Sequence, residues 1–177
     1  MMRICVSHWS GRGRRSTGLK ILISFTQVYQ DIGIETPAWQ DLQMVATVAA
    51  GKFHFNGITP DIRLEEIEIY ADPFLQKVFY NIFDTLLRHG NGVSAISLTT
   101  ADREDQPAIR IEDGGTGIPE AEKEEIFLRK YGKKTGPGLF LTREIFAITG
   151  IGIRETGTVG TGARFESLVP AGAFRRT

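Results

Sequence analysis

Residues 74–89 carry the strongest helical pattern in the chain, and this pattern constrains the fold more than any other feature. Apolar residues recur at three- and four-residue spacing, as one buried helical face requires. They are Val78, Phe79, Ile82, Phe83 and Leu86. Asp72 and Pro73 precede the stretch as a cap and a first-turn proline. Because such a face must be buried against another layer of secondary structure, the chain is expected to fold in layers.

Alternating segments on both sides of this helix supply the second layer. Residues 93–100 and 107–113 alternate apolar and polar side chains, and the polar link 101–106 between them predicts an antiparallel hairpin. Further alternating or apolar stretches cover 52–57, 61–70, 151–156 and 163–169. Further helices are expected over 40–50, 120–126 and 138–149. The order of these elements predicts an α+β fold, with helices on one face of a single sheet.

Composition narrows the class of protein. The chain has 177 residues, enough for one domain with a real core. Lys and Arg number 21 and Asp and Glu number 21, which argues against a dedicated nucleic-acid binder. No apolar run approaches the roughly 20 residues of a membrane-spanning helix, so no membrane segment is expected. The single cysteine, Cys5, excludes an internal disulfide and favours a cytoplasmic location.

The N-terminal part has a different pattern. Residues 1–16 are basic and without periodicity, and we expect them to be poorly ordered. Residues 17–33 favour a helix that ends at Gly33, with an apolar stripe at three- and four-residue spacing. The stripe consists of Leu22, Phe25, Tyr29 and Ile32. It could pair with another helix in a homodimer or pack on its own domain, and the sequence leaves both open.

Glycines gather in four segments of the second half of the chain. These are 113–117, Gly132, 136–138 and 160–162. Such density is typical of backbone that approaches a ligand. Two familiar phosphate motifs are excluded, because Phe127 stands where a P-loop needs its first glycine and neither Gly-x-Gly has the third glycine of a dinucleotide fold. A nucleotide would therefore bind by another geometry.

The polar side of the 74–89 helix carries four chemically distinct groups. Asn81, Thr85, Arg88 and His89 fall at i, i+4, i+7 and i+8, so they share one side of the helix. Amide and hydroxyl oxygens suit a hard cation, and a guanidinium suits phosphate oxygens. The alternative is an ordinary amphipathic helix with a solvated face.

Taken in order, these segments resemble the ATP-binding catalytic domain of sensor histidine kinases. That domain belongs to the superfamily of gyrase, a heat-shock chaperone and mismatch-repair ATPases. The resemblance covers about residues 52–170. It implies a Bergerat-type two-layer α/β sandwich, whose mixed, mostly antiparallel sheet is covered on one face by helices. It also implies an ATP-binding domain at 36–172, the end of a dimerisation helix at 17–35 and a short tail at 173–177.

The resemblance implies where adenine binds. Asp113 matches the aspartate that accepts a hydrogen bond from the adenine amino group, a donor that guanine lacks at that position. Gly115 and Gly117 would let the backbone pass close to the nucleotide. Ile118 and Leu139 would line the adenine slot.

Other nucleotide contacts follow from the same resemblance. Residues 128–135 match the ATP lid, in which Tyr131 would cover the ribose and Lys134 would reach phosphate. Gly136 and Gly138 precede a helix N-terminus, where free N–H groups favour phosphate. Thr161, within the last glycine segment, is included among the nucleotide-binding residues.

The long helix matches the family's asparagine box. Asn81, Arg88 and His89 agree with it, whereas Thr85 replaces a second asparagine. The resemblance implies Mg²⁺ bound by Asn81 and Thr85, with the shorter Thr85 placing metal affinity in question. Asn81 cannot act as a general base, so Asn81 and Arg88 would position ATP for phosphoryl transfer rather than hydrolysis. Ala163 is a second departure, where a hydroxyl residue is usual.

No acceptor histidine is evident among His8, His54 and His89. The sequence therefore predicts a catalytic module that presents Mg-ATP to a histidine-bearing dimerisation domain supplied elsewhere, with a response regulator downstream. Two alternatives stay open: a degenerate nucleotide-binding or interaction module, and an ATPase or serine kinase of the same fold.

Overall fold

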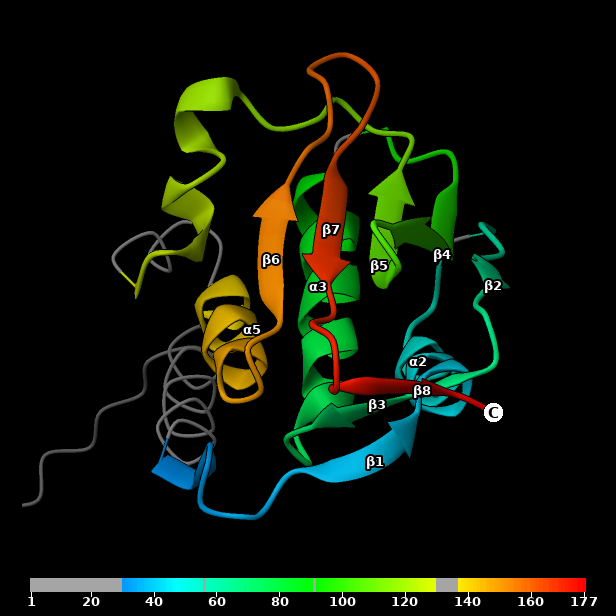
Figure 1. The fold of residues 1–177 in the computed structure, drawn as a ribbon. Coiled ribbons are helices and arrows are strands. Elements are labelled where there is room, and N and C mark those ends of the chain that lie inside the picture. The colour runs from blue at the N-terminus through cyan, green and yellow to red at the C-terminus, as the bar shows by residue number, and fades with distance from the viewer. Residues whose placement is uncertain (1–29, 56, 91, 130–136) are drawn as a thin grey trace, which may run out of the picture. The chain divides into compact units, whose positions relative to one another are not determined.

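The structure is a computed structural model of the chain, and it describes residues 30–55, 57–90, 92–129 and 137–177. The expected disordered segment 1–16, nearly all of the 17–33 helix, and Tyr131, Lys134 and Gly136 lie outside these residues. The chain divides into two units, Met1–Asp31 and Ile32–Thr177, and the second unit is the one described below (Figure 1). None of the described helices combines the length and apolarity needed to cross a bilayer.

A five-stranded sheet forms one layer, in the order β2-β4-β5-β7-β6. Its strands are β2 (Asp61–Arg63), β4 (Ile96–Arg103), β5 (Gln106–Asp113), β6 (Gly152–Glu155) and β7 (Arg164–Leu168). The β2–β4 pair is parallel, and the other pairs are antiparallel. The predicted hairpin is confirmed, and its turn residues Glu104 and Asp105 have φ of 50° and 64°.

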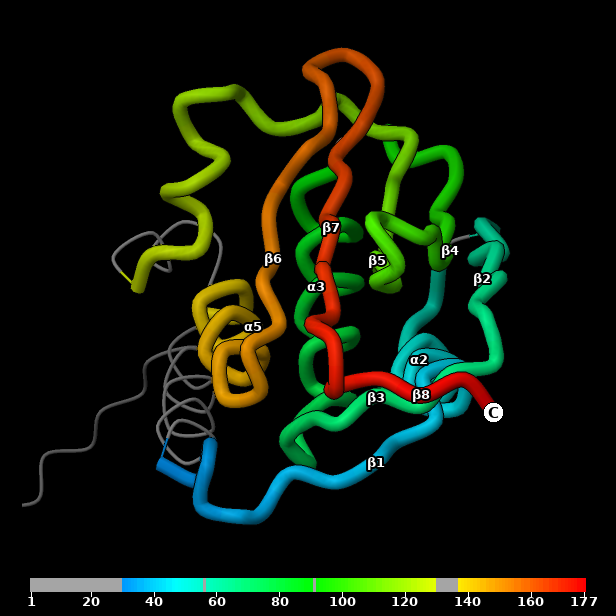
Figure 2. Tube along the Cα trace, in the orientation of Figure 1, coloured from blue at the N-terminus to red at the C-terminus, as the bar shows by residue number. Residues whose placement is uncertain are grey.

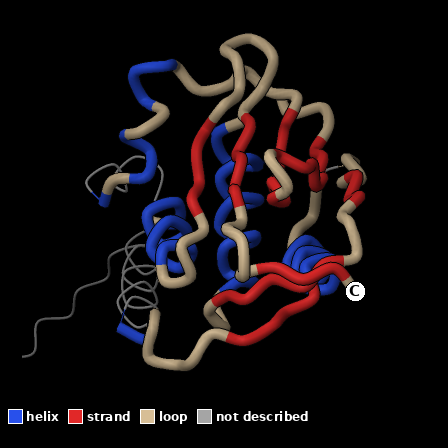
Figure 3. The backbone as a smooth tube through the Cα atoms, in the orientation of Figure 1, coloured by secondary structure: helices blue, strands red, loops and turns tan. Residues whose placement is uncertain are grey.

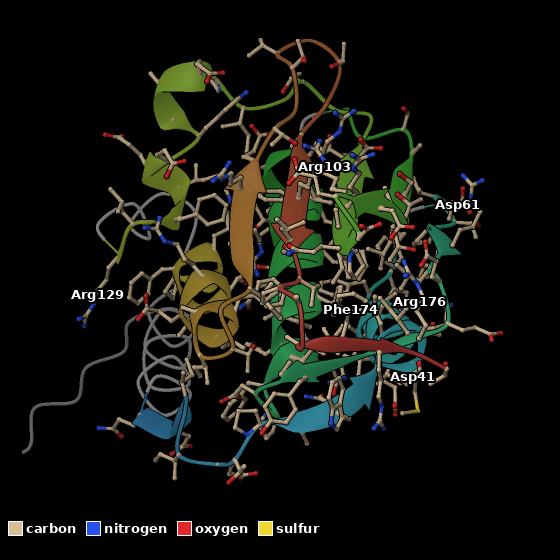
Figure 4. All side chains as sticks on the ribbon, in the orientation of Figure 1. Asp41, Asp61, Arg103, Arg129, Phe174 and Arg176 are labelled. Atoms are coloured by element: carbon tan, nitrogen blue, oxygen red, sulfur yellow. The ribbon has the colours of Figure 1, made fainter. Side chains whose placement is uncertain are left out.

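A second sheet has three antiparallel strands in the order β1-β3-β8 (Figure 3). They are β1 (Ala38–Asp41), β3 (Ile67–Ala71) and β8 (Phe174–Arg176). The residues expected to be a tail thus include a strand. Two features explain this: Phe174 packs against the core, and Arg176 pairs with Asp102 at 2.5 Å (Figure 4).

Helices form the other layer. They are α2 (Leu42–Ala50), α3 (Leu75–His89) and α5 (Gly138–Ala147), and α3 packs against both of the others. In Figure 1, α3 lies behind the five-stranded sheet with α5 beside it. The largest fully buried side chains include Phe79, Phe83, Phe127, Phe146 and Phe165, drawn from both layers. The predicted α+β sandwich is therefore confirmed.

Three segments differ from the pattern expected of them. The stretch 61–70 is divided between β2 and β3, which belong to two different sheets rather than to the single sheet expected. Residues 52–57 form no strand among those described, because Phe53 and Phe55 instead place their rings 6.1 and 5.9 Å from that of Phe83 on α3. The acidic helix expected over 120–126 is split into two 3₁₀ turns, η1 (Glu120–Glu122) and η2 (Glu125–Phe127). Between them, Lys123 reaches away to the carbonyl of Gly157 at 2.8 Å.

Candidate functional site

Asp113 ends β5 with a carboxylate that is only 7% exposed. Its Oδ1 accepts two backbone hydrogen bonds, from Gly115 N at 2.9 Å and from Ala163 N at 2.8 Å. Its Oδ2 is also buried but has no hydrogen-bond partner among the described residues. Because a buried polar atom without a partner is costly, Oδ2 marks a place for a donor from a bound molecule.

This carboxylate lies in the wall of a pocket. The pocket is lined by residues from α3, β5, the segment after β5, and β7: Thr85, Leu86, His89, Gly90, Asp113, Gly117, Ile118, Ala163 and Phe165. Apolar side chains with a few polar groups among them are typical of a site for a flat organic ligand. The structure thus brings together five predicted site residues: Thr85, His89, Asp113, Gly117 and Ile118.

Glycines allow the backbone to close tightly around Asp113. A Cβ on Gly90 would lie 2.7 Å from Asp113 Oδ2, and one on Gly162 would lie 1.9 Å from the Asp113 carbonyl oxygen. A Cβ on Gly115 would lie 2.1 Å from the Gly90 carbonyl oxygen. Gly117 has φ of +74°, which glycine adopts without strain. The wall of the pocket therefore cannot accept side chains at these positions.

The loop between β6 and β7 borders the same pocket. It runs beside the segment that follows β5 (Figure 2), and Gly160 N donates to Thr116 O at 2.8 Å. The buried Glu155 holds both ends of this loop, since its Oε1 accepts from Gly157 N and from Arg164 N, each at 3.0 Å. Glu155 therefore positions the strand end that presents the Ala163 N–H to Asp113.

The polar side of α3 is largely buried rather than solvated. Asn81 is 6% exposed and donates through Nδ2 to Gly138 O at 3.0 Å, which fastens α3 to the start of α5. Thr85 is 7% exposed and donates its hydroxyl to Asn81 O at 2.8 Å. That bond uses the Thr85 proton and leaves the lone pairs of Oγ1. Two neutral oxygen-bearing side chains thus lie one turn apart, the donor type that Mg²⁺ prefers.

Arg88 lies apart from the Asp113 pocket. Its Nε donates to Asp84 Oδ1 at 2.7 Å, and its side chain is 60% exposed. It lines a different hollow, beside Phe55, Ile58 and Gly92. A predicted phosphate-binding role for Arg88 would require it to leave Asp84.

The remaining described candidates have other positions. Leu139 is 1% exposed within the core and does not line the pocket. Gly138 supplies the carbonyl that Asn81 holds. Thr161 is exposed and donates to Thr158 O at 2.9 Å within its own loop. The described residues contain no group of three His, Cys, Asp or Glu side chains that could hold a metal, so a cation here would depend on amide, hydroxyl and ligand oxygens.

Sequence reasoning missed Gly90 in the pocket wall and Glu155 beside the pocket, and it named Ala163 only as a place where a hydroxyl is usual. Gly90 follows α3 with φ of −74°, so no positive φ demands glycine there, and its requirement comes from the close approach of Leu86 O, Val93 and Asp113. Ala163 contributes a backbone N–H, which any residue would provide. Glu155, which holds the β6–β7 loop, follows Arg154 in a short strand, so nothing in the sequence set it apart from a surface acid.

Comparison with known proteins identifies the family of the chain. The family described as "Histidine kinase-, DNA gyrase B-, and HSP90-like ATPase" matches residues 71–173. The alginate biosynthesis sensor protein KinB of Pseudomonas aeruginosa is 32% identical over 116 residues, covering 63% of this chain and 18% of KinB. The adaptive-response sensory kinase SasA of Prochlorococcus marinus is 30% identical over 124 residues, covering 64% of this chain and 32% of SasA.

Solved structures share the fold. Full-length ShkA in complex with AMPPNP superposes with a TM-score of 0.73 at 21% identity, covering 93% of this chain and 38% of ShkA. The mycobacterial sensor histidine kinase MprB superposes with a TM-score of 0.67 at 16% identity, covering 76% of this chain and 97% of that structure. The chain thus spans less than a third of the KinB and SasA sequences that it matches.

Proposed function

The chain belongs to the family of histidine kinase-, DNA gyrase B- and HSP90-like ATPases, as an ATP-binding catalytic module of the sensor histidine kinase type, and we propose that it donates the γ-phosphoryl group of Mg-ATP to a histidine. The acceptor would lie in a histidine-bearing dimerisation domain, and a response regulator would receive the phosphoryl group next. We further propose a cytoplasmic location, and pairing of two copies through residues 17–33.

The buried Oδ2 of Asp113 carries this proposal. An ionised carboxylate only accepts hydrogen bonds, and the adenine amino group is a donor. Guanine would present a carbonyl oxygen to the same atom, leaving two acceptors face to face. The two backbone bonds on Oδ1 hold the carboxylate so that Oδ2 faces the pocket. This arrangement supports adenine as the ligand.

The chemistry of the site supports transfer rather than hydrolysis. Among the described residues that line the pocket, no glutamate is placed to activate water, and Asn81 holds Gly138 instead of acting as a base. In the proposed reaction the bond between the γ-phosphorus and its bridging oxygen breaks, ADP leaves, and a bond forms between phosphorus and a ring nitrogen of the acceptor. Mg²⁺, held through Asn81 and Thr85, would neutralise phosphate charge.

Calorimetric titration with a non-hydrolysable ATP analogue tests the proposed site. We expect saturable binding that depends on Mg²⁺, and much weaker binding of the matching GTP analogue. Asp113→Asn replaces an acceptor-only group by an amide that can also donate, so discrimination against guanine should fall. Asp105→Asn is the matched control, because Asp105 lies in the exposed β4–β5 turn. Unchanged selectivity in Asp113→Asn would overturn the site.

A phosphoryl-transfer assay tests the reaction itself. The full chain is mixed with radiolabelled ATP and a separately purified histidine-bearing dimerisation domain. Label on the acceptor histidine is expected. Binding of ATP without any transfer would favour the degenerate module, and release of inorganic phosphate without transfer would favour the ATPase.

A further inference from the structure

A further hollow lies between the end of α2 and the first turns of α3. It shares no lining residue with the Asp113 pocket. Its lining combines two lysines, one amide and three ring-bearing residues: Lys52, Lys77, Gln76, Pro73, Phe74 and Tyr80. No role in the proposed phosphoryl transfer falls to any of them.

The two lysines of this hollow have no acidic partner among the described residues, although most described cations do. Arg88, for example, forms an ion pair with Asp84 at 2.7 Å. Burial lowers the pKa of Lys77, Asp84 raises it, and Lys52 lowers it again. Both lysines line the same hollow, so an anion bound there would lie near both ammonium groups.

Gln76 adds an unsatisfied hydrogen-bond donor to the same hollow. Its Nε2 is buried and has no acceptor among the described residues. Asp72, which precedes α3, accepts from other donors: Oδ1 accepts from Phe74 N at 2.8 Å and Oδ2 from Gly33 N at 3.0 Å. A bound molecule that brings an acceptor into the hollow would satisfy Gln76 Nε2.

The ring of Tyr80 restrains the ammonium group of Lys77. Lys77 Nζ lies 4.4 Å from the ring centroid of Tyr80, and that ring lies 4.7 Å from the ring of Phe53. A cation over a packed aromatic ring is restrained, so less conformational entropy is lost when it binds an anion.

We propose that this hollow binds a phosphate group through Lys52, Lys77 and Gln76. Phosphate matches the site because its two negative charges balance two ammonium groups, and its oxygens also provide an acceptor for the amide. Free inorganic phosphate and a phosphate monoester share this chemistry.

Heteronuclear NMR of the full chain, without nucleotide and at constant ionic strength, tests the site. Inorganic phosphate is titrated at pH 7 while the side-chain amide of Gln76 and the backbone amides of residues 74–77 are followed. Saturable shifts confined to this region are expected. A parallel titration with glycerol 3-phosphate identifies the source: tighter binding than inorganic phosphate assigns the site to a monoester, and equal or weaker binding assigns it to the free ion. Shifts that fail to saturate would overturn the proposal.

Variants that remove one charge distinguish phosphate binding in this hollow from a general effect of ions on the protein. Lys77→Met and Lys52→Met should each weaken phosphate binding about tenfold, the loss expected for one charge-assisted hydrogen bond. Arg154→Met is the matched control, because Arg154 is an exposed cation on β6 outside the hollow. The phosphate affinity of this variant should match that of the wild type. Gln76→Glu places a carboxylate between the lysines and should abolish binding. Equal affinity in all four variants would overturn the proposal.

Discussion

Glu155 Oε2 on β6 lies 3.5 Å from Lys123 Nζ, at a site where the Glu155 side chain is completely buried. The same ammonium donates to Gly157 O at 2.8 Å and pairs with Glu120 at 2.8 Å. Through its other oxygen, Glu155 binds both ends of the β6–β7 loop. One buried carboxylate thus connects the segment after β5, the β6–β7 loop and, through Ala163, the carboxylate of Asp113.

Glu155→Ala is expected to lower the free energy of unfolding by about 3 kcal/mol, because two backbone N–H groups lose a charged acceptor. Lys123 would also lose its buried counter-ion. Urea unfolding followed by circular dichroism measures the loss. Glu120→Gln is the control, since Glu120 pairs with the same lysine but its side chain is 88% exposed. That change should alter stability by at most about 0.5 kcal/mol; equal losses in both variants would contradict the positioning role of Glu155.

Gly90→Ala should abolish adenine-nucleotide binding. Its Cβ would lie 2.4 Å from both Leu86 O and Val93 Cγ2 and 2.7 Å from Asp113 Oδ2, so the pocket wall must move. Calorimetry with the ATP analogue measures the effect, and circular dichroism verifies the fold. Gly152→Ala is the matched control, because nothing lies within 4 Å of its added Cβ. Wild-type affinity in Gly90→Ala would show that the pocket at Asp113 is not where the nucleotide binds.

The sequence predicted the parts of the site that depend on side-chain identity. Asp113 could be recognised because only a carboxylate offers adenine an acceptor, and Thr85 and His89 because helical spacing places them on one side of α3. Both lie in the described pocket. The assignments of Arg88 and Leu139 to the nucleotide stay predictions, with Arg88 bonded to Asp84 and Leu139 in the core.

Features made by backbone or by distant pairing could not be predicted in this way. The Ala163 N–H that orients Asp113 belongs to every residue type except proline, so the residue type at position 163 could not predict this bond. The strand β8 depends on pairing with β3, more than a hundred positions earlier along the chain. The alternation of residue types in 52–57 indicated a strand, but Phe53 and Phe55 pack against Phe83 on α3 instead. In each case the deciding contact is long-range.

Lys77→Met should stabilise the fold at pH 7, and its advantage should shrink as the pH rises. The folded state lowers the pKa of Lys77 below 10.5, chiefly by burial. Between the lowered value and 10.5 the unfolded chain holds more protons, so wild-type stability rises with pH across that window. Below the window, the charged Lys77 weakens the fold throughout.

Urea unfolding midpoints of the wild type and Lys77→Met, compared at pH 7 and pH 10 in phosphate-free buffer, measure this difference. Arg154→Met, an exposed cation, should show no pH-dependent gap from the wild type. A gap that widens toward pH 10 would have the opposite sign and would contradict the lowered pKa of Lys77.

Thr85→Asn should increase the gain in ATP-analogue affinity that Mg²⁺ provides, by about tenfold or ~1.4 kcal/mol. Thr85 is 7% exposed beside the pocket, and its Oγ1 retains lone pairs after donating to Asn81 O. An asparagine oxygen at this position extends one bond further toward the phosphates. Thr85→Val is nearly isosteric and removes the oxygen, so it should reduce the Mg²⁺-dependent gain. Calorimetric titrations with and without Mg²⁺ compare the three proteins. If Mg²⁺ changes the ATP-analogue affinity equally in all three proteins, Thr85 does not bind the metal. Asn81 would then be the remaining proposed protein ligand on α3.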